Sequence, residues 1–260
     1  MAVDDFTSTS QYRRCQEIFA RWCPGFRNAG ELFRDLVADL VTPETLLLDL
    51  GCGRTSLAAE PIQRAKRSVG VDLSLPDLQH NRALDAVIMA DGGGLPFADS
   101  SFDLVVSQWA VEHLEHPGLV FAQIARILRP GGSCVIFTTN AHNYVPLLSR
   151  LLSGESQSGL IARLLHRPAH ESFPTFYRAN TAARIGSHCR RTGMCLKSTV
   201  YVGNPFYLAF SPLLFCCALV FEKITDAPRL NRFKLYLLTV LTKPADESSS
   251  GGGFIPGVHP

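Results

Sequence analysis

The sequence predicts an α/β protein built on a Rossmann-like, doubly wound sheet of seven mostly parallel strands. The run over residues 46–50 is apolar apart from Asp49, which suits a strand covered on both faces of a parallel sheet. Short apolar runs then alternate with segments of helical spacing as far as residue 139, a pattern typical of βαβ units. Two later runs, 195–202 and 234–242, are expected to form an antiparallel edge.

The individual elements follow in order along the chain. Apolar residues at helical spacing predict two helices within residues 11–40, separated by Cys23-Pro24-Gly25. Strands are expected at 46–50, 69–72, 86–90, 102–107 and 133–139, and helices near 57–66, 76–84, 117–128 and 181–192. Gly193 is expected to cap the last helix at its C-terminal end.

We expect a single domain over residues 1–244. Within it, the connections 140–180 and 203–233 are longer than ordinary ones, and these helical insertions are expected to form a cap. Residues 245–260 are rich in serine and glycine and predict a flexible tail.

Composition narrows the class of partner and compartment. The formal net charge is +2 and the Lys and Arg residues are scattered, which argues against nucleic acid as a partner. Eight cysteines occur without a C-x-x-C pair, and residues 1–10 are polar and acidic, unlike a signal peptide. We therefore expect buried free thiols in a reducing, cytoplasmic setting, and no metal site. The sequence leaves the oligomeric state open.

A strand, a glycine turn and a helix start follow one another, as in a nucleotide-binding loop. Gly51 and Gly53 allow a sharp turn and the close approach of a ligand. Thr55 or Ser56 is expected to cap a helix whose N-terminus faces an anion. A dinucleotide fingerprint requires a third glycine where Ser56 stands. Asp49 would repel a pyrophosphate and suits a ligand that carries a positive group.

Two more acids end the following strands. Asp72 lies 23 residues after Asp49, where a carboxylate can accept both ribose hydroxyls. Asp91 ends the next strand, where it can accept from an adenine amino group. Each acid has a plainer interpretation as a strand-end or turn residue, and Asp91 precedes the glycine run 92–94. Asp103 is interpreted as a structural turn acid.

At these residues the sequence resembles the class I S-adenosylmethionine-dependent methyltransferases, in the subgroup similar to quinone-biosynthesis methyltransferases. The motifs occur in family order within residues 45–140: Leu48-Asp49-Leu50-Gly51-Cys52-Gly53, Gly70-Val71-Asp72-Leu73, Ala90-Asp91, Leu95-Pro96-Phe97, residues 101–107 and Ile127-Leu128-Arg129-Pro130-Gly131-Gly132. The resemblance implies S-adenosyl-L-methionine as cofactor, with its methionine part over the glycine turn, its ribose at Asp72 and its adenine at Asp91. The contact residues that it implies are Asp49, Gly51, Cys52, Gly53, Asp72, Leu73, Asp91 and Gly92.

The sequence shows no clear catalytic dyad. Methyl transfer requires none, because the cofactor already carries its leaving group and the protein mainly aligns the acceptor. A base helps only where the acceptor is a hydroxyl or a protonated amine. His113 is the best candidate for that base, and the alternative is that it packs the start of a helix. Glu112, Glu115 and His116 are interpreted as a solvated helix face rather than as metal ligands.

The acceptor is the least determined part of the prediction. Residues 206–221 form 16 residues without a charge, fewer than the roughly 20 that span a bilayer. They are either a buried helix or a monotopic element in peripheral contact with a membrane. Residues 170–178 either line an acceptor pocket or dock as a loop on the core.

These observations predict a methyltransferase that carries out O- or C-methylation of a small-molecule or lipid-linked acceptor. Two alternatives remain open: an NAD(P)- or flavin-dependent oxidoreductase, and a non-catalytic cofactor-binding interaction protein.

Overall fold

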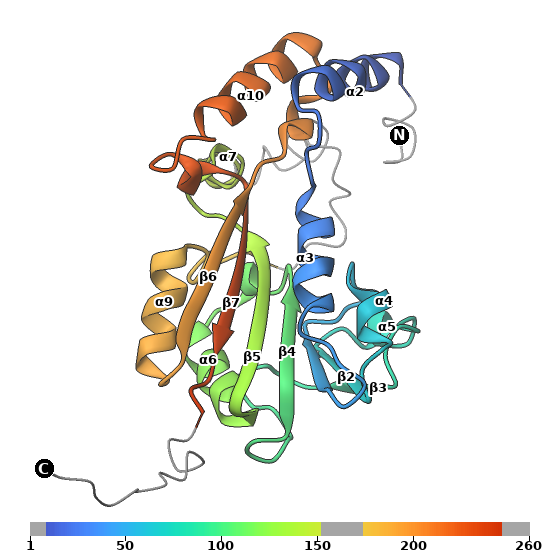
Figure 1. Cartoon of the computed structure of the whole chain (residues 1–260), viewed down its shortest axis with the longest axis vertical. Coiled ribbons are helices and arrows are strands. Elements are labelled where there is room, and N and C mark those ends of the chain that lie inside the picture. Colours follow the sequence, from blue (N-terminus) through green and yellow to red (C-terminus); the bar gives the residue numbers. More distant parts are fainter. Residues whose placement is uncertain (1–8, 152–173, 246–260) are drawn as a thin grey trace, which may run out of the picture.

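A seven-stranded sheet forms the centre of the computed structural model, which describes residues 9–151 and 174–245 (Figure 1). The strands are β1 (Leu46–Leu50), β2 (Arg67–Asp72), β3 (Ala86–Met89), β4 (Phe102–Gln108), β5 (Leu128–Thr139), β6 (Cys195–Val202) and β7 (Tyr236–Thr242). Their order is β3-β2-β1-β4-β5-β7-β6. All pairs among β1 to β5 are parallel, and β7 is antiparallel to both of its neighbours. The predicted fold class is confirmed, with the reversed strand lying just inside the edge strand β6.

Helices cover the two faces of the sheet unequally. One face carries α6 (Pro117–Ile127) and α9 (Ala182–Arg191), and a core that includes Phe121 and Ile185 lies beneath them. The other face carries α3 (Ala29–Ala38) and α4 (Ala59–Ile62), which bury Phe33 and Ile62 against the sheet. The predicted bounds of α6 and α9 are correct to within one residue at each end. Gly193 has φ +73° just after α9, which confirms its capping position.

The helices after β1 and β2 are much shorter than predicted. Only α4 and α5 (Leu75–Leu78) form there, each four residues long. The side chain of Asn81 ends the helical path after α5, because its amide donates to the Gly53 carbonyl and its oxygen accepts from the Ala83 amide. The chain between β2 and β3 is thereby tied to the glycine turn instead of continuing as a helix.

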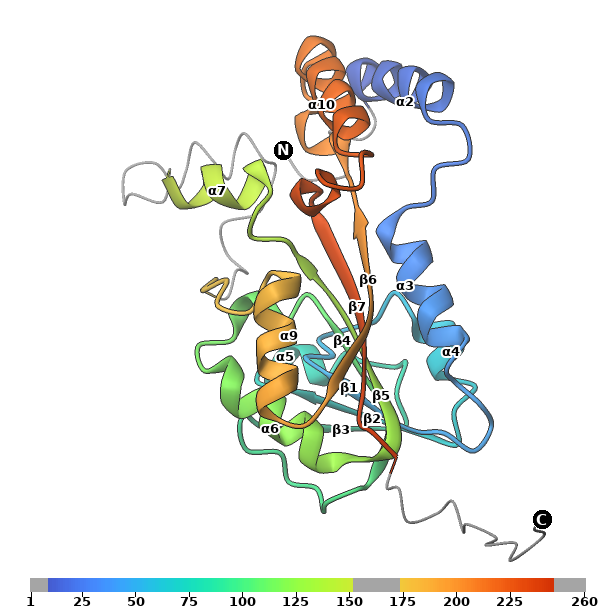
Figure 2. The same ribbon diagram turned by 60° about the vertical axis from the view of Figure 1, so that its left-hand side comes forward.

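A helical layer stands beyond the carboxyl ends of β4 and β5, and we call residues 10–26 and 205–234 the cap. It contains α2 (Ser10–Trp22), the short helices η2 (Pro205–Leu208) and η3 (Asn231–Phe233), and α10 (Pro212–Ile224). Figure 2 shows α2 and α10 side by side, and a separate apolar cluster joins them through Cys15, Phe215 and Leu219. A further helix, α7 (Tyr144–Leu151), touches the cap where the Tyr144 ring meets Phe221 edge-on at 5.3 Å. The N-terminal helix α2 thus packs on the second of the two predicted insertions, while residues 152–173 of the first lie outside the described residues.

All eight cysteines are free thiols, as expected. Cys52 and Cys134 are buried, but Cys216 and Cys217 are exposed, which corrects the expectation that the thiols are buried. These two thiols are exposed because α10 has two apolar sides and the described residues cover only one of them. Across residues 9–151 and 174–245, the helices are all too short or too polar to traverse a bilayer. The predicted tail from residue 245 onward lies outside the described residues, apart from its first position.

Candidate functional site

The glycine turn lies where β1, β2 and β4 end together. Gly51 has φ +76° and Gly53 has φ +47°, a region in which side chains are disfavoured. The amides of Gly51 and Cys52 both donate to the Val71 carbonyl, at 2.8 and 3.2 Å, which fastens the turn to β2. A Cβ atom on Gly51 would lie 2.4 Å from Cβ of Ala110, whereas one on Gly53 would meet no atom within 4 Å. Gly51 is thus required by the protein, and Gly53 leaves space for a ligand.

Asp49 is a buried carboxylate at the centre of this site. It lies between Gly70 of β2 and Val106 of β4 and is only 2% exposed. Within the described residues, no donor reaches its side-chain oxygens. Burial, and secondarily the carboxylate of Asp72, raise the pKa of Asp49 to about 7. A cation at this point would lower that pKa again, so the site favours a positively charged ligand.

Cys52 packs inside the turn rather than presenting a reactive thiol. Its side chain lies against Gly70, where an added Cβ would come within 2.6 Å of the sulfur. Burial, followed by the charges of Asp49 and Asp72, raises the pKa of the Cys52 thiol. A thiol that does not ionise is a poor nucleophile, so Cys52 shapes the turn.

Asp72 ends β2 with both oxygens directed at backbone amides. One oxygen accepts from the Gly53 amide at 2.9 Å and the other from the Ser74 amide at 2.8 Å. The next residue, Leu73, is 61% exposed beside it. A carboxylate oxygen has two acceptor positions, so these bonds orient Asp72 and still leave each oxygen able to accept from a ligand hydroxyl.

Asp91 forms the tight turn that its plainer interpretation predicted. Its carboxylate accepts from the Gly93 amide at 2.7 Å, and the residue is exposed. An added Cβ on Gly92 would lie 3.3 Å from Leu50, so the turn packs closely against the end of β1. The turn therefore fixes an exposed acid at the carboxyl end of β3, next to the other two.

The helix N-terminus expected after the turn is replaced by an irregular loop. Ala58 caps α4 without a side-chain bond, while the Ser56 hydroxyl accepts from the Ala58 amide and Thr55 does not cap the helix. The side chain of Gln108, at the end of β4, accepts from the Leu57 amide at 2.8 Å. The predicted anion site at a helix N-terminus is therefore wrong, because a helix of one turn has only a small dipole.

The chain after β4 brings His113 to the same edge of the sheet. The short helix η1 (Val111–His113) is held by residues 174–178: the Phe176 and Tyr177 amides both donate to the Glu112 carbonyl. Nδ1 of His113 lies 3.0 Å from the Pro174 carbonyl. Because a carbonyl can only accept, Nδ1 carries the proton, and the lone pair of the neutral ring is on Nε2. His113 is therefore held in the tautomer that a general base at Nε2 requires.

A buried polar network supports η1 from below, and the sequence did not indicate it. The Thr138 hydroxyl donates to the Glu112 carboxylate, and the Asn180 amide donates to the Thr138 hydroxyl at 2.7 Å. Asn180 also donates to the Thr139 carbonyl, which fixes the orientation of its amide. Glu112 is thus a buried structural acid, which corrects its interpretation as part of a solvated helix face.

Trp109 is a second feature that the sequence did not indicate. It has φ +52° and is 41% exposed, and its ring centroid lies 5.2 Å from that of Phe137. Its amide donates to the Phe137 carbonyl, which holds the strained backbone in place. Strained residues cluster at functional sites, and this one directly precedes Ala110 at the glycine turn.

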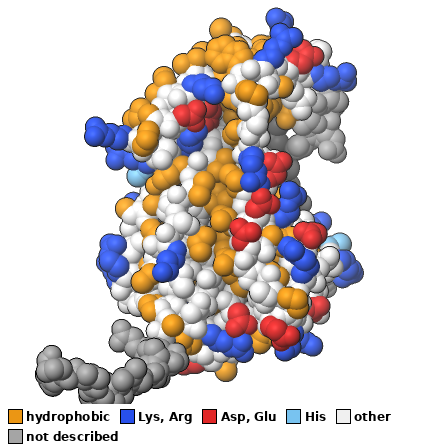
Figure 3. Space-filling model, in the orientation of Figure 1, with side chains coloured by type: hydrophobic (Ala, Val, Ile, Leu, Met, Phe, Trp, Pro, Cys, Tyr) orange, Lys and Arg blue, Asp and Glu red, His pale blue; other side chains and the backbone are white. Residues whose placement is uncertain are grey.

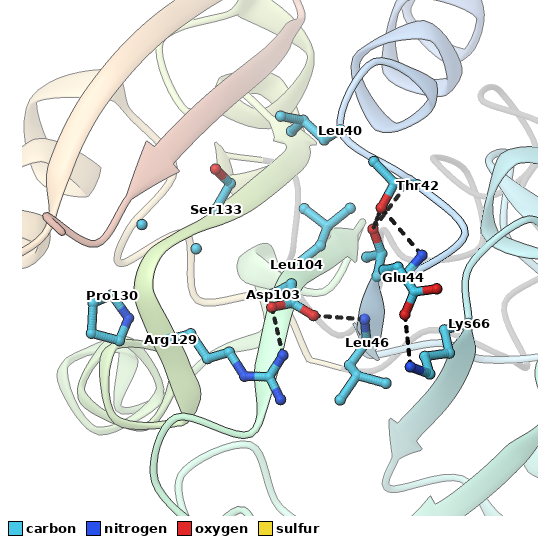
Figure 4. A pocket seen from close by; sticks show the side chains of 13 residues that line it. Leu40, Thr42, Glu44, Leu46, Lys66, Asp103, Leu104, Arg129, Pro130 and Ser133 are labelled. Carbon is cyan, nitrogen blue, oxygen red and sulfur yellow. Dashed lines mark hydrogen bonds and ion pairs between the residues drawn. The ribbon is translucent and has the colours of Figure 1, made fainter. Parts of the chain in front are cut away.

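A cavity of about 690 Å³ opens at the opposite, amino-terminal edge of the sheet (Figure 4). Its charged groups neutralise one another: Arg129 pairs with Asp103 at 2.7 Å, and Lys66 pairs with Glu44 at 2.7 Å. Asp103 also accepts from the Leu46 amide at 2.8 Å, in line with its predicted structural part. The cavity is remote from the glycine turn and carries none of the candidate site residues.

Residues 48–136 match the model of a methyltransferase domain. This segment is about a third of the chain, and over it the chain is similar to the class I S-adenosylmethionine-dependent methyltransferases. The motifs that carried the resemblance all lie within the matched segment, and the strand order places the glycine turn, Asp72 and Asp91 at one edge of the sheet.

Two named relatives and one solved structure illustrate the similarity. A malonyl-[acyl-carrier protein] O-methyltransferase of Pseudescherichia vulneris is 37% identical over 39% of this chain and 41% of its own length. A demethylmenaquinone methyltransferase of Renibacterium salmoninarum is 34% identical over 40% of this chain and 46% of its own. These matches span less than half the length of either relative. A geranyl diphosphate C-methyltransferase of Streptomyces coelicolor shares the fold, with a TM-score of 0.55 and 17% identity over 81% of this chain and 76% of its own.

The geometry fits S-adenosylmethionine, the cofactor that the resemblance implies. S-adenosylmethionine carries a sulfonium and an ammonium group, and Asp49 offers a buried carboxylate that no donor from the described residues satisfies. Gly53 leaves the room that a side chain would take, and three acids end adjacent strands. The structure brings the predicted contact residues together at the ends of β1, β2 and β3. Of the predicted acceptor segment 170–178, residues 170–173 lie outside the described residues.

Proposed function

We propose that this chain transfers a methyl group from S-adenosylmethionine to an acceptor bound beneath the cap. The observation that carries the proposal is the buried Asp49 beside a glycine turn that is open at Gly53. A nucleotide with a pyrophosphate would meet an acid there, and the methyl donor would meet a counter-charge. The family match supports the same activity.

In this proposal the predicted contact residues have separate parts. Gly51, Cys52 and Gly53 form the floor under the methionine portion, and Asp49 stabilises its positive charge. Asp72 accepts from the ribose hydroxyls, with Leu73 packing beside it. Asp91 and Gly92 take the adenine, since their turn is exposed at the end of β3.

The bound donor would supply a methyl group on a good leaving group. The chain then has to align the acceptor, exclude water and, where the acceptor carries a proton, remove it. His113 is proposed as the base at Nε2, because the Pro174 carbonyl fixes its proton on Nδ1. Trp109 offers an aromatic wall between the turn and Phe137.

We propose a small-molecule or lipid-linked acceptor, methylated on oxygen or carbon. The named relatives support this range, since one is an O-methyltransferase for a malonyl group on its carrier protein and a structural neighbour methylates carbon in geranyl diphosphate. Peripheral contact with a membrane through residues 206–221 belongs to the same proposal. It draws support from the exposed side of α10.

Calorimetric titration with S-adenosylhomocysteine and with NADH separates the methyltransferase from an oxidoreductase. We expect binding of the first compound alone, and binding of NADH alone would refute the proposal. Radiolabelled methyl donor added to acceptor extracts then separates catalysis from mere cofactor binding. Label that never leaves the donor, with binding intact, would favour the non-catalytic alternative.

A further inference from the structure

The helix α10 is apolar on two sides, and residues 9–151 and 174–245 cover only one of them. Phe215 and Leu219 are buried against α2. The opposite side carries Leu213, Cys217, Val220 and Ile224, which we call the outer stripe. Leu213 is 75% exposed, Val220 48% and Ile224 55%, and Cys217 is exposed as well. Their spacing of four, three and four residues places them on one face of the helix.

The cap surrounding the outer stripe is basic. It contains seven Lys and Arg residues against three Asp and Glu residues, a net charge of +4, whereas the whole chain carries +2. The remainder of the chain is therefore acidic by two charges. Lys234 is paired with Glu222 and Asp226, and Arg14 and Arg21 on α2 are exposed. In Figure 3, hydrophobic side chains gather over α10 at the top of the molecule, and Lys and Arg side chains border them.

This combination fits an anionic lipid surface better than a second copy of the chain. A symmetric dimer through the outer stripe would bring two caps of charge +4 together, and their repulsion opposes association. The stripe is also one helix wide, while stable interfaces involve roughly 20–30 residues on each side. An apolar stripe with a basic border is the pattern of helices that lie in the headgroup region of anionic bilayers.

Other exposed apolar groups lie at the same end of the molecule. Trp22, in the last turn of α2, is 54% exposed, and tryptophan favours the membrane interface. On α7, which touches α10 through Tyr144 and Phe221, Leu147 and Leu148 are 45% and 48% exposed. The chain enters the cap from the end of β6 and returns into β7, so the cap stands at the edge that holds the glycine turn.

We propose that the outer stripe docks this protein on an anionic membrane, and that the acceptor is a lipid whose reacting group lies in the headgroup region of that membrane. The second half rests on the proposed function, because it assigns the substrate of the same site. Docking by α10 turns the carboxyl ends of β4 and β5 toward the bilayer (Figure 1). An acceptor could then pass from the membrane to the site without crossing water.

Flotation of the full chain with vesicles tests the docking. The vesicles contain phosphatidylcholine alone or phosphatidylcholine with phosphatidylglycerol, and the proteins are wild type, Leu213→Gln and the matched control Leu119→Gln. Leu119 is 58% exposed on α6, away from the cap. We expect wild type to float with anionic vesicles only, and Leu213→Gln to bind them about tenfold more weakly, since a buried leucine contributes at least that factor. The control should bind as wild type does. Added salt should release both proteins from the anionic vesicles, because salt screens the attraction to the lipid charges.

Three results would overturn the docking. These are the absence of wild-type flotation, equal loss in the two leucine variants, and a lipid-free dimer that Leu213→Gln dissociates in light scattering. A separate readout tests the acceptor: labelled methyl donor should pass its label into lipid extracted from the bound vesicles when these are made from native lipids. Unlabelled lipid with intact docking and intact S-adenosylhomocysteine binding refutes the acceptor half alone. Loss of S-adenosylhomocysteine binding in calorimetry would instead refute the proposed function and leave docking standing.

Discussion

Two alanine substitutions in the glycine turn should have different effects on the free energy of unfolding. In Gly51→Ala the residue must hold φ +76°, which costs about 1–2 kcal/mol for a side chain. Its new Cβ also falls 2.4 Å from Cβ of Ala110, and overpacking of this kind typically costs 1–3 kcal/mol. The sum, about 2–5 kcal/mol, is a large share of the stability of an ordinary domain.

Gly53→Ala serves as the matched control. It carries the same type of backbone strain, at φ +47°, but its Cβ meets nothing within 4 Å. We expect this variant to lose only about 1–2 kcal/mol. Its affinity for S-adenosylhomocysteine should nevertheless fall at least about tenfold, because the new methyl group enters the space proposed for the ligand.

Urea denaturation of both variants, with and without Ala110→Gly, measures these contributions. Ala110→Gly should restore about 1–3 kcal/mol to Gly51→Ala, because it removes the overlapping atom, and should restore nothing to Gly53→Ala. Equal losses in the two glycine variants, with no recovery in the double variant, would refute the close approach of β4 to the turn. Unchanged ligand affinity in Gly53→Ala would refute its place under the cofactor.

Three further predictions concern a titrating group, the base and the cap. Between pH values of about 4 and 7 the folded state keeps a proton on Asp49 that the unfolded state has lost. The free energy of unfolding should therefore fall by up to about 4 kcal/mol as pH rises through this range. Asp49→Asn should remove that pH dependence in urea denaturation. The same variant should bind the positively charged donor more weakly at pH 8, and unchanged calorimetric affinity would contradict its proposed part. His113→Asn keeps a donor for the Pro174 carbonyl and removes Nε2. We expect kcat to fall about 10²–10⁴-fold while the melting temperature stays the same. A variant with the turnover of wild type would exclude a base at this position. Gly203→Ala places a Cβ among the Glu222 carboxylate oxygens, so we expect calorimetry to show a lower melting temperature. An unchanged melting temperature would show that the cap is not packed against Gly203.

Local patterns were enough to predict the sheet, because each strand is a short apolar run between turn residues. The glycine turn and its three acids were also predictable, since strand ends of a parallel sheet meet at one edge. The buried network of Glu112, Thr138 and Asn180 was not, because its members lie far apart in the chain and none has a local signature. The lengths of α4 and α5 were wrong because apolar spacing cannot show that Asn81 bonds to the turn.

The packing of residues 206–221 was not predictable for the same reason. The apolar residues in 206–221 left open whether this segment is buried or exposed. In the structure, one side of α10 is buried and the opposite side is exposed. The side that is buried depends on α2, whose contacts with Phe215 and Leu219 cross most of the chain. No pattern within a window of the sequence can report such a contact.

The position of β7 has a consequence for how the chain folds. Among the described strands β6 pairs only with β7, yet β7 is synthesised after β6 and must insert between β5 and β6. Until then β5 has an open edge, and residues 195–202 have no strand to join. Contacts that close late in synthesis slow folding and expose unpaired edges to other chains. A C-terminal truncation that removes β7 should therefore remove two strands from the sheet, because β6 then has no strand to pair with.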